Sequence, residues 1–145
     1  MQDRARKLWA RTRLVEWPGR YCLVSLPVAA APEAAALVGA GAGGFAALVL
    51  ERDEVSLTVA EEAWSASPLR ARARSEAGPY RVVTLDLDLE LDVVGYLAPA
   101  AERLAAAGVS IVPQCAFLKD HLLFREGDLA RAREVLEEWI TECRG

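Results

Sequence analysis

The fold is decided by residues 80–124, which read YRVVTLDLDLELDVVGYLAPAAERLAAAGVSIVPQCAFLKDHLLF. Apolar and β-branched residues dominate both ends of this stretch, and its middle has the spacing of a helix that Gly108 closes. The predicted elements are a strand, a helix, a strand, a tight turn and a strand over 80–91, 94–107, 109–117, 118–119 and 121–124. The stretch therefore predicts the order strand, helix, strand, strand.

The same order is predicted in the first half of the chain. Residues 21–26 form an apolar run that ends at Pro27, and 32–38 begins with Pro and Glu before Ala-rich helix formers. Two β-rich runs, 45–50 and 55–59, are joined by the charged hairpin connection 51–54. A last helix is predicted from near Asp128, and its apolar face consists of Leu129, Ala132, Leu136, Trp139 and Ile140.

The repeated order predicts an α+β fold of two small subdomains that pack together, because neither has enough core to be robust alone. The expected organisation is an N-terminal strand and turn over 1–19, a first subdomain with a linker over 20–79, and a second subdomain over 80–145. Residues 8–15 alternate loosely, which favours the N-terminal strand. Residues 64–78 have no clear period, so we expect there an eroded closing element and a linker.

Composition and charge exclude several classes of protein. The 145 residues are 53% hydrophobic and 26% charged, which is enough apolar material for a globular core. The 17 Lys and Arg residues against 21 Asp and Glu residues give a net charge of −4, which argues against a dedicated nucleic-acid-binding protein. The longest uncharged run, 34–50, is shorter than the roughly 20 apolar residues of a spanning helix, so we expect no membrane anchor.

The N-terminus and the cysteines indicate the compartment. Residues 1–7 are charged and lead into no apolar segment, so no secretory signal is predicted and the expected location is the cytoplasm. Cys22, Cys115 and Cys143 lack CxxC spacing and are odd in number, which favours reduced thiols over a disulfide framework.

Residues 39–44 read GAGAGG and match the GxGxxG pattern of dinucleotide-binding loops. In that pattern a strand precedes the glycines and a helix follows them, so that the helix N-terminus faces the pyrophosphate. Here the order is inverted. We therefore predict a loop that lets helix and strand pack closely, and no nucleotide cofactor.

Asp86, Asp88, Glu90 and Asp92 alternate with aliphatic residues. On a strand this pattern would place four carboxylates on one face, in a row and not in a metal cage. The predicted arrangement is a solvated face, or one neutralised by Arg70, Arg72 and Arg74, with no metal site.

Cys115 and His121 flank the predicted turn and could meet as a thiol and base pair. No third orienting group is evident, and the sequence contains no GxSxG, P-loop or HExxH motif. We therefore predict no catalytic residues and no enzymatic activity, and we interpret Cys115 as a packing residue.

Residues 4–20 contain six basic residues, Arg4, Arg6, Lys7, Arg11, Arg13 and Arg20, together with Trp9 and Trp17. Basic residues with aromatics are the ingredients of single-strand nucleic-acid binding. The alternative is the charged outer face of an edge strand, which prevents edge pairing. The net charge of the chain favours the edge strand.

Three segments resemble the ACT domain: residues 93–97, residues 104–111 and residues 120–129, which read DHLLFREGDL. They are similar in particular to the tandem-ACT proteins related to aspartokinase regulatory domains and to the cytosolic arginine sensors of animals. Residues 52–57 resemble the hairpin between the middle strands of that group. The resemblance implies βαββαβ, ferredoxin-like subdomains that bind an amino acid.

The resemblance also implies the ligand-binding residues, namely Ser56, Leu57, Val94, Gly95, Ala116, Phe117 and Asp120. The ligand carboxylate is expected at the start of the helix near Val94 and Gly95, and its amino group at Asp120. A plain surface role for Asp120 at the end of the hairpin stays open.

The sequence therefore predicts a non-enzymatic, cytoplasmic sensor or regulatory protein that binds a small molecule, an amino acid by the resemblance, and forms a homodimer. Cys115 and Ala116 stand where the family commonly has Ser and Thr. The alternative is accordingly an interaction module whose pocket no longer binds ligand. A nucleic-acid accessory protein that uses the N-terminal basic stretch is the third hypothesis.

Overall fold

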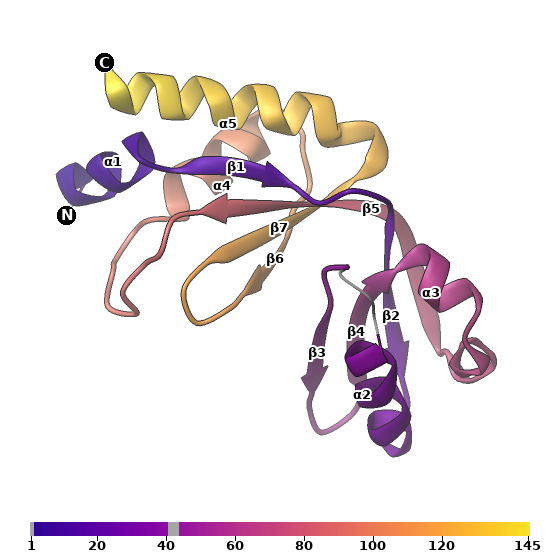
Figure 1. Cartoon of the computed structure of the whole chain (residues 1–145). Helices are drawn as coiled ribbons and strands as arrows, with labels where there is room; N and C mark the ends of the chain where they lie inside the picture. The colour runs from indigo at the N-terminus through magenta and orange to yellow at the C-terminus, as the bar shows by residue number, and fades with distance from the viewer. Residues whose placement is uncertain (1, 41–43) are drawn as a thin grey trace. The chain divides into compact units, whose positions relative to one another are not determined.

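The computed structural model describes residues 2–40 and 44–145 and divides the chain into two compact units (Figure 1). One unit, called here the continuous unit, spans 17–82. The other, called the discontinuous unit, combines 1–16 with 83–145. The predicted boundaries at 19/20 and 79/80 lie within three residues of these divisions, and the N-terminal segment is grouped with the C-terminal part of the chain.

The first four regular elements of the continuous unit follow the predicted order strand, helix, strand, strand. Its elements are β2 (Tyr21–Leu26), α2 (Ala31–Ala40), β3 (Ala47–Leu50), β4 (Val55–Ala60), α3 (Glu61–Ser65) and the first part of β5 (Ser75–Asp86). The strands follow the order β3-β4-β2-β5, and each neighbouring pair is antiparallel. The predicted helix over 32–38 corresponds to α2.

The segment 64–78 is more ordered than predicted. Trp64 ends up buried in α3, and Leu69 is buried in a 3-10 helix over Pro68–Arg72. The Trp64 indole Nε1 donates to Glu76 Oε1 at 2.6 Å, on the strand β5 that already begins at Ser75. The prediction of a linker here was therefore wrong, because two apolar residues without a regular period anchor this segment to the core; the short helices are compatible with the eroded closing element.

The discontinuous unit is built from both ends of the chain. Its elements are α1 (Gln2–Ala10), β1 (Arg13–Glu16), the end of β5, α4 (Ala98–Ala106), β6 (Val112–Cys115), β7 (Asp120–Arg125) and α5 (Leu129–Arg144). The strand order is β1-β5-β7-β6, and α5 packs against α1 and α4 (Figure 1).

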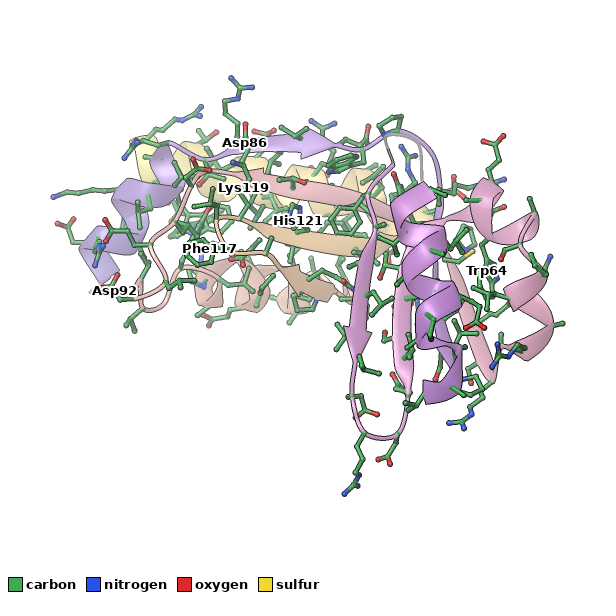
Figure 2. All side chains as sticks on the ribbon, turned by 60° about the horizontal axis from the view of Figure 1, so that its bottom comes forward. Trp64, Asp86, Asp92, Phe117, Lys119 and His121 are labelled. Atoms are coloured by element: carbon green, nitrogen blue, oxygen red, sulfur yellow. The ribbon has the colours of Figure 1, made fainter. Side chains whose placement is uncertain are left out.

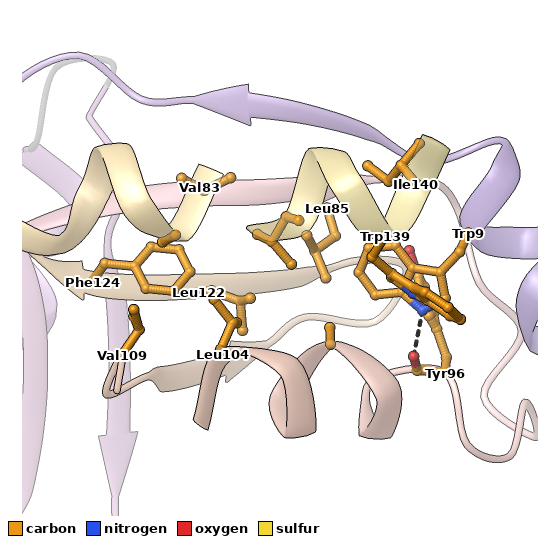
Figure 3. Packing of buried hydrophobic residues seen from close by; sticks show 13 residues of the cluster. Trp9, Val83, Leu85, Tyr96, Leu104, Val109, Leu122, Phe124, Trp139 and Ile140 are labelled. Carbon is orange, nitrogen blue, oxygen red and sulfur yellow. Dashed lines mark hydrogen bonds between the residues drawn. The ribbon is translucent and has the colours of Figure 1, made fainter. Parts of the chain in front are cut away.

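The core of the discontinuous unit confirms the predicted face of the last helix. Ala132, Leu136, Trp139 and Ile140 are buried, and they pack with aliphatic and aromatic residues of β5, β7, α4 and α1 (Figure 3). The 3.6-residue period is therefore a reliable guide in this helix, because one side of α5 is buried against α1, α4 and β7.

The N-terminal strand predicted over 8–15 was wrong at its start. Residues 2–10 form the helix α1, and only Arg13–Glu16 is a strand, β1, which pairs with β5. Ala5 and Trp9, four positions apart, are both buried on one helical face. The Thr12 hydroxyl donates to the carbonyl oxygen of Leu8 at the end of the helix.

The strand predicted over 80–91 ends earlier than expected. β5 stops at Asp86, so Asp88, Glu90 and Asp92 do not share a strand face with it. The predicted row of four carboxylates was therefore wrong. Lys119 pairs with Asp86 and Asp88, Arg4 pairs with Glu90, and Arg70 and Arg72 pair instead with Glu76 and Glu33.

Two further element bounds differ from the prediction. The helix predicted over 94–107 begins at Ala98, after Gly95 has taken a positive φ of 79°. The strand predicted over 109–117 is limited to Val112–Cys115. Gly41 and Gly43 of the GxGxxG match lie outside the described residues. Gly39 lies within α2, and β3 follows the glycines, which is the inverted order.

Across the described ranges, no helix is long and apolar enough to cross a membrane. Within the same ranges, no group of three or more His, Cys, Asp or Glu side chains is placed to hold a metal ion.

Candidate ligand-binding site

Two connections of the discontinuous unit meet: the 87–97 loop between β5 and α4, and the 116–119 turn between β6 and β7. The Leu89 N–H donates to the Leu118 carbonyl oxygen at 2.8 Å. The Lys119 ammonium lies 3.5 Å from Asp86 Oδ1 and is hydrogen-bonded to Asp88, which raises the pKa of Lys119. In Figure 2, Asp86 and Lys119 are neighbours, with Phe117 at the turn. These bonds fix the loop against the turn.

The end of the 87–97 loop is held by aromatic side chains in the core. The Trp9 indole Nε1 donates to the Tyr96 carbonyl oxygen at 2.5 Å (Figure 3), and the Tyr96 hydroxyl is hydrogen-bonded to Thr12 Oγ1. Burial raises the pKa of Tyr96 above its ordinary value. The backbone before α4 is therefore rigidly positioned.

Helix α4 starts without a side-chain cap. Leu97 occupies the N-cap position and its side chain cannot accept a hydrogen bond, and Pro99 lies in the first turn. The N–H groups of Ala98 and Ala100 have no acceptor within the helix because they belong to its first turn. This end of α4 also carries the positive part of the helix dipole, so it favours an anionic group.

A pocket of about 480 Å³ lies between the 87–97 loop, the start of α4 and the 116–119 turn. We call it the loop–turn pocket. Its lining residues are Leu89, Glu90, Leu91, Val93, Gly95, Tyr96, Leu97, Ala98, Cys115, Ala116, Phe117, Leu118, Lys119 and Asp120.

The loop–turn pocket brings together four of the seven predicted site residues: Gly95, Ala116, Phe117 and Asp120. Val94 instead lines a neighbouring hollow. Ser56 and Leu57 belong to β4 of the continuous unit, where Leu57 is fully buried in the core. Sequence reasoning missed the leucines of the 87–97 loop, because the residues after Asp86 were assigned to a strand.

Asp120 is the carboxylate in this pocket that no ion pair engages within the described part of the chain. The other two charged lining groups are satisfied, since Glu90 pairs with Arg4 at 3.2 Å and Lys119 with Asp86 and Asp88. A hydrogen bond to Asp120, with burial as a second cause, raises the pKa of the Cys115 thiol. The pocket therefore has one available negative charge.

The thiol and base pair of Cys115 and His121 is not formed. Cys115 is opposite Asp120 in the β6–β7 register and His121 is opposite Gln114, so the two side chains point to opposite faces of the sheet. His121 Nδ1 is hydrogen-bonded to Thr84 Oγ1 at 2.8 Å, and burial lowers its pKa. Cys115 is exposed, so its interpretation as a packing residue was wrong.

A second hollow, of about 400 Å³, lies between α1, α4 and α5. The Arg103 guanidinium carbon stands 3.7 Å above the centroid of the Trp139 ring, and Arg103 Nη2 lies 3.3 Å from Glu142 Oε2. Arg6 donates to the Glu142 carbonyl oxygen. These arginines are engaged in tying the helices together, a role that the sequence alone did not indicate.

The N-terminal basic stretch is largely used within the fold. Arg4, Lys7 and Arg13 are paired with Glu90, Asp3 and Asp86. Trp9 is fully buried, so it has no face on which a nucleic-acid base could stack. β1 lies at the end of the strand order, as expected for a charged edge strand.

No protein-family model and no curated protein matches the chain. The solved structures do. A Vibrio cholerae protein of unknown function superposes with a TM-score of 0.74 at 19% identity, over 96% of this chain and 97% of that one. A protein from Agrobacterium tumefaciens superposes with a TM-score of 0.71 at 23% identity, over 89% of each chain.

The regulatory subunit of aspartate kinase from Thermus thermophilus superposes with a TM-score of 0.63 at 10% identity, over 88% of this chain and 97% of that one. The chain shares its fold with aspartate kinase regulatory domains. This confirms the predicted relation at the level of the fold.

Proposed function

We propose that the protein is a non-enzymatic regulatory or sensor protein of ACT type that binds an amino acid in the loop–turn pocket. One observation carries the proposal: the Asp120 carboxylate, which no ion pair engages among the described residues, and the uncapped start of α4 line the same pocket. An amino acid has one group for each. Its carboxylate would accept from the N–H groups of α4, and its ammonium group would pair with Asp120.

The fold supports this assignment. In the continuous unit the order β5-β2-β4-β3 is that of a ferredoxin-like βαββαβ unit, with its fourth, first, third and second strands side by side. In the discontinuous unit β1 would take the place of the fourth strand, next to β5, β7 and β6. We propose two ferredoxin-like subdomains on this basis. Contributions of Ser56, Leu57 and Val94 to ligand binding stay predictions.

The experiment that tests the function is a thermal-shift screen against the twenty amino acids, followed by calorimetry. A ligand at a hundred times its Kd adds about 2.7 kcal/mol to the free energy of unfolding. The variant Asp120→Asn should weaken binding by about 1.5 to 3 kcal/mol, the usual contribution of a hydrogen bond to a charged group. Its stability should change less.

The matched control is Asp92→Asn, which lies in the 87–97 loop but outside the pocket lining. It removes the same charge and should bind the ligand as the native protein does. The ligand amide, which lacks the carboxylate, should bind more weakly than the free acid. Equal affinity of Asp120→Asn and Asp92→Asn for a ligand of the native protein would contradict the assignment.

A protein-interaction module is the second candidate, and exposed apolar side chains favour it. Leu91 and Phe117 are each 73% exposed, and at β3, the end of a strand order, Val49 and Leu50 are more than half exposed. We propose a cytoplasmic homodimer that covers part of this surface. Light scattering should give twice the chain mass. A monomer across micromolar concentrations would remove the dimer.

A further inference from the structure

The loop–turn pocket has apolar walls of unusual exposure. Leu89, Leu91, Val93, Leu97, Phe117 and Leu118 contribute to its lining. Leu91 and Phe117 are each 73% exposed, and Leu118 is 47% exposed. Large exposed apolar side chains gathered around one pocket mark a binding surface, because covering them with an apolar group of a ligand lowers the free energy.

The charged side chains of the pocket lining other than Asp120 already have partners. Once Asp120 has paired with an ammonium group, the remaining charged lining residues are Glu90 and Lys119. Glu90 is engaged by Arg4, and Lys119 by Asp86 and Asp88. A second charge on the ligand would have to compete with these existing ion pairs for a counter-charge while it lies against apolar walls.

A neutral polar side chain of the ligand also finds no free side-chain hydroxyl or amide in the lining. The pocket lining contains no Ser, Thr, Asn or Gln among the described residues. The Tyr96 hydroxyl is already hydrogen-bonded to Thr12, and the Cys115 thiol to Asp120. A buried hydroxyl or amide without a partner costs about 1 to 3 kcal/mol.

We infer that the loop–turn pocket selects an α-amino acid with an apolar side chain, which lies against Leu91 and Phe117 while Asp120 holds the ammonium group. This inference rests on the proposed function. The volume of about 480 Å³ accommodates a side chain of the size of leucine or phenylalanine together with the amino-acid head group.

Matched ligand pairs test the inference on the native protein. L-norleucine and L-lysine share a four-carbon side chain and differ by the terminal ammonium group. L-valine and L-threonine have the same shape and differ by a methyl against a hydroxyl group. Calorimetry should show norleucine at least about tenfold tighter than lysine, which is about 1.4 kcal/mol, and valine tighter than threonine.

Variants locate the apolar contact. Phe117→Ser should weaken norleucine binding severalfold, since it removes a wall of the pocket, and its high exposure leaves the fold intact. Val28→Ser, at an exposed apolar residue outside both the pocket lining and the surface proposed for the dimer, is the control and should leave the affinity unchanged.

The outcomes separate the two proposals. Binding of lysine or threonine as tight as that of its apolar counterpart overturns the apolar selection and leaves amino-acid binding in place. An unchanged norleucine affinity in Phe117→Ser overturns the placement of the side chain. Failure of every amino acid to bind overturns the proposed function and this inference with it.

Discussion

The indole Nε1 of Trp9 donates a 2.5 Å hydrogen bond to the carbonyl oxygen of Tyr96, and the two rings meet edge to face with centroids 4.6 Å apart. Tyr96 lies two residues before α4 begins. Helix α1, at the start of the chain, therefore positions the backbone at which the proposed ligand carboxylate binds.

Trp9→Phe should lower both stability and ligand affinity. The change keeps an aromatic ring but removes the hydrogen bond that the indole donates to the buried Tyr96 carbonyl oxygen. The expected cost is about 1 to 3 kcal/mol in the free energy of unfolding. Urea denaturation measures this. Tyr96→Phe is the comparison, because it removes the hydroxyl and keeps the carbonyl bond. A smaller loss in Trp9→Phe than in Tyr96→Phe would contradict the argument.

Local periodicity predicted much of the fold. The apolar face of α5 and the short helix α2 follow from residue spacing, and the strands β6 and β7 follow from apolar runs around a turn. In α5 the predicted apolar face is the buried one, at Ala132, Leu136, Trp139 and Ile140, so its pattern is not overridden by contacts from elsewhere.

The rest depends on contacts between distant residues. Leu87, Leu89 and Leu91 continue the alternation of β5, yet Lys119 and the Leu118 carbonyl oxygen hold this segment as a loop. The alternation of residues 8–15 predicts a strand at Trp9, but this residue belongs to α1 and is buried with residues of α5 and of the 87–97 loop. Predicted site residues on the turn were brought together, but the loop leucines of the pocket depend on where β5 ends.

The raised pKa of Tyr96 predicts that the protein loses stability at alkaline pH. Its pKa is raised by burial above the ordinary value of 10, so above about pH 10 the unfolded chain releases a proton that the folded chain retains. The contribution is present below pH 10 and is lost as the pH rises. Unfolding curves from pH 8 to 11 should show a steeper decline for the native protein than for Tyr96→Phe. Parallel curves would contradict the shift.

The lowered pKa of His121 predicts that the protein loses stability at acidic pH. Burial lowers its pKa below 6.5, with Asp120 opposing and Lys119 adding to this effect. The unfolded chain then takes up a proton before the folded chain does, so stability is lost as the pH falls below about 6.5. The chain has one histidine. Its NMR titration should therefore give a single curve with a midpoint below 6.5, and a midpoint above 6.5 would show that the ring is not buried as described.

Cys115 reports directly on Asp120. The thiol is exposed, but its hydrogen bond to Asp120 raises its pKa, so the reactive thiolate is scarce at neutral pH. In a Cys22→Ala, Cys143→Ala background, Cys115 should be labelled near pH 8 more slowly than a small-molecule thiol in solution. Asp120→Asn should accelerate the labelling, because it removes the carboxylate that disfavours the thiolate, whereas Asp92→Asn should not.

An amino acid bound through Asp120 should also change the labelling rate of Cys115 in the protein that keeps Asp120 and leave it unchanged in Asp120→Asn. Equal labelling rates in all three proteins would place the Asp120 carboxylate away from the thiol, and with it away from the pocket wall that the proposed function requires.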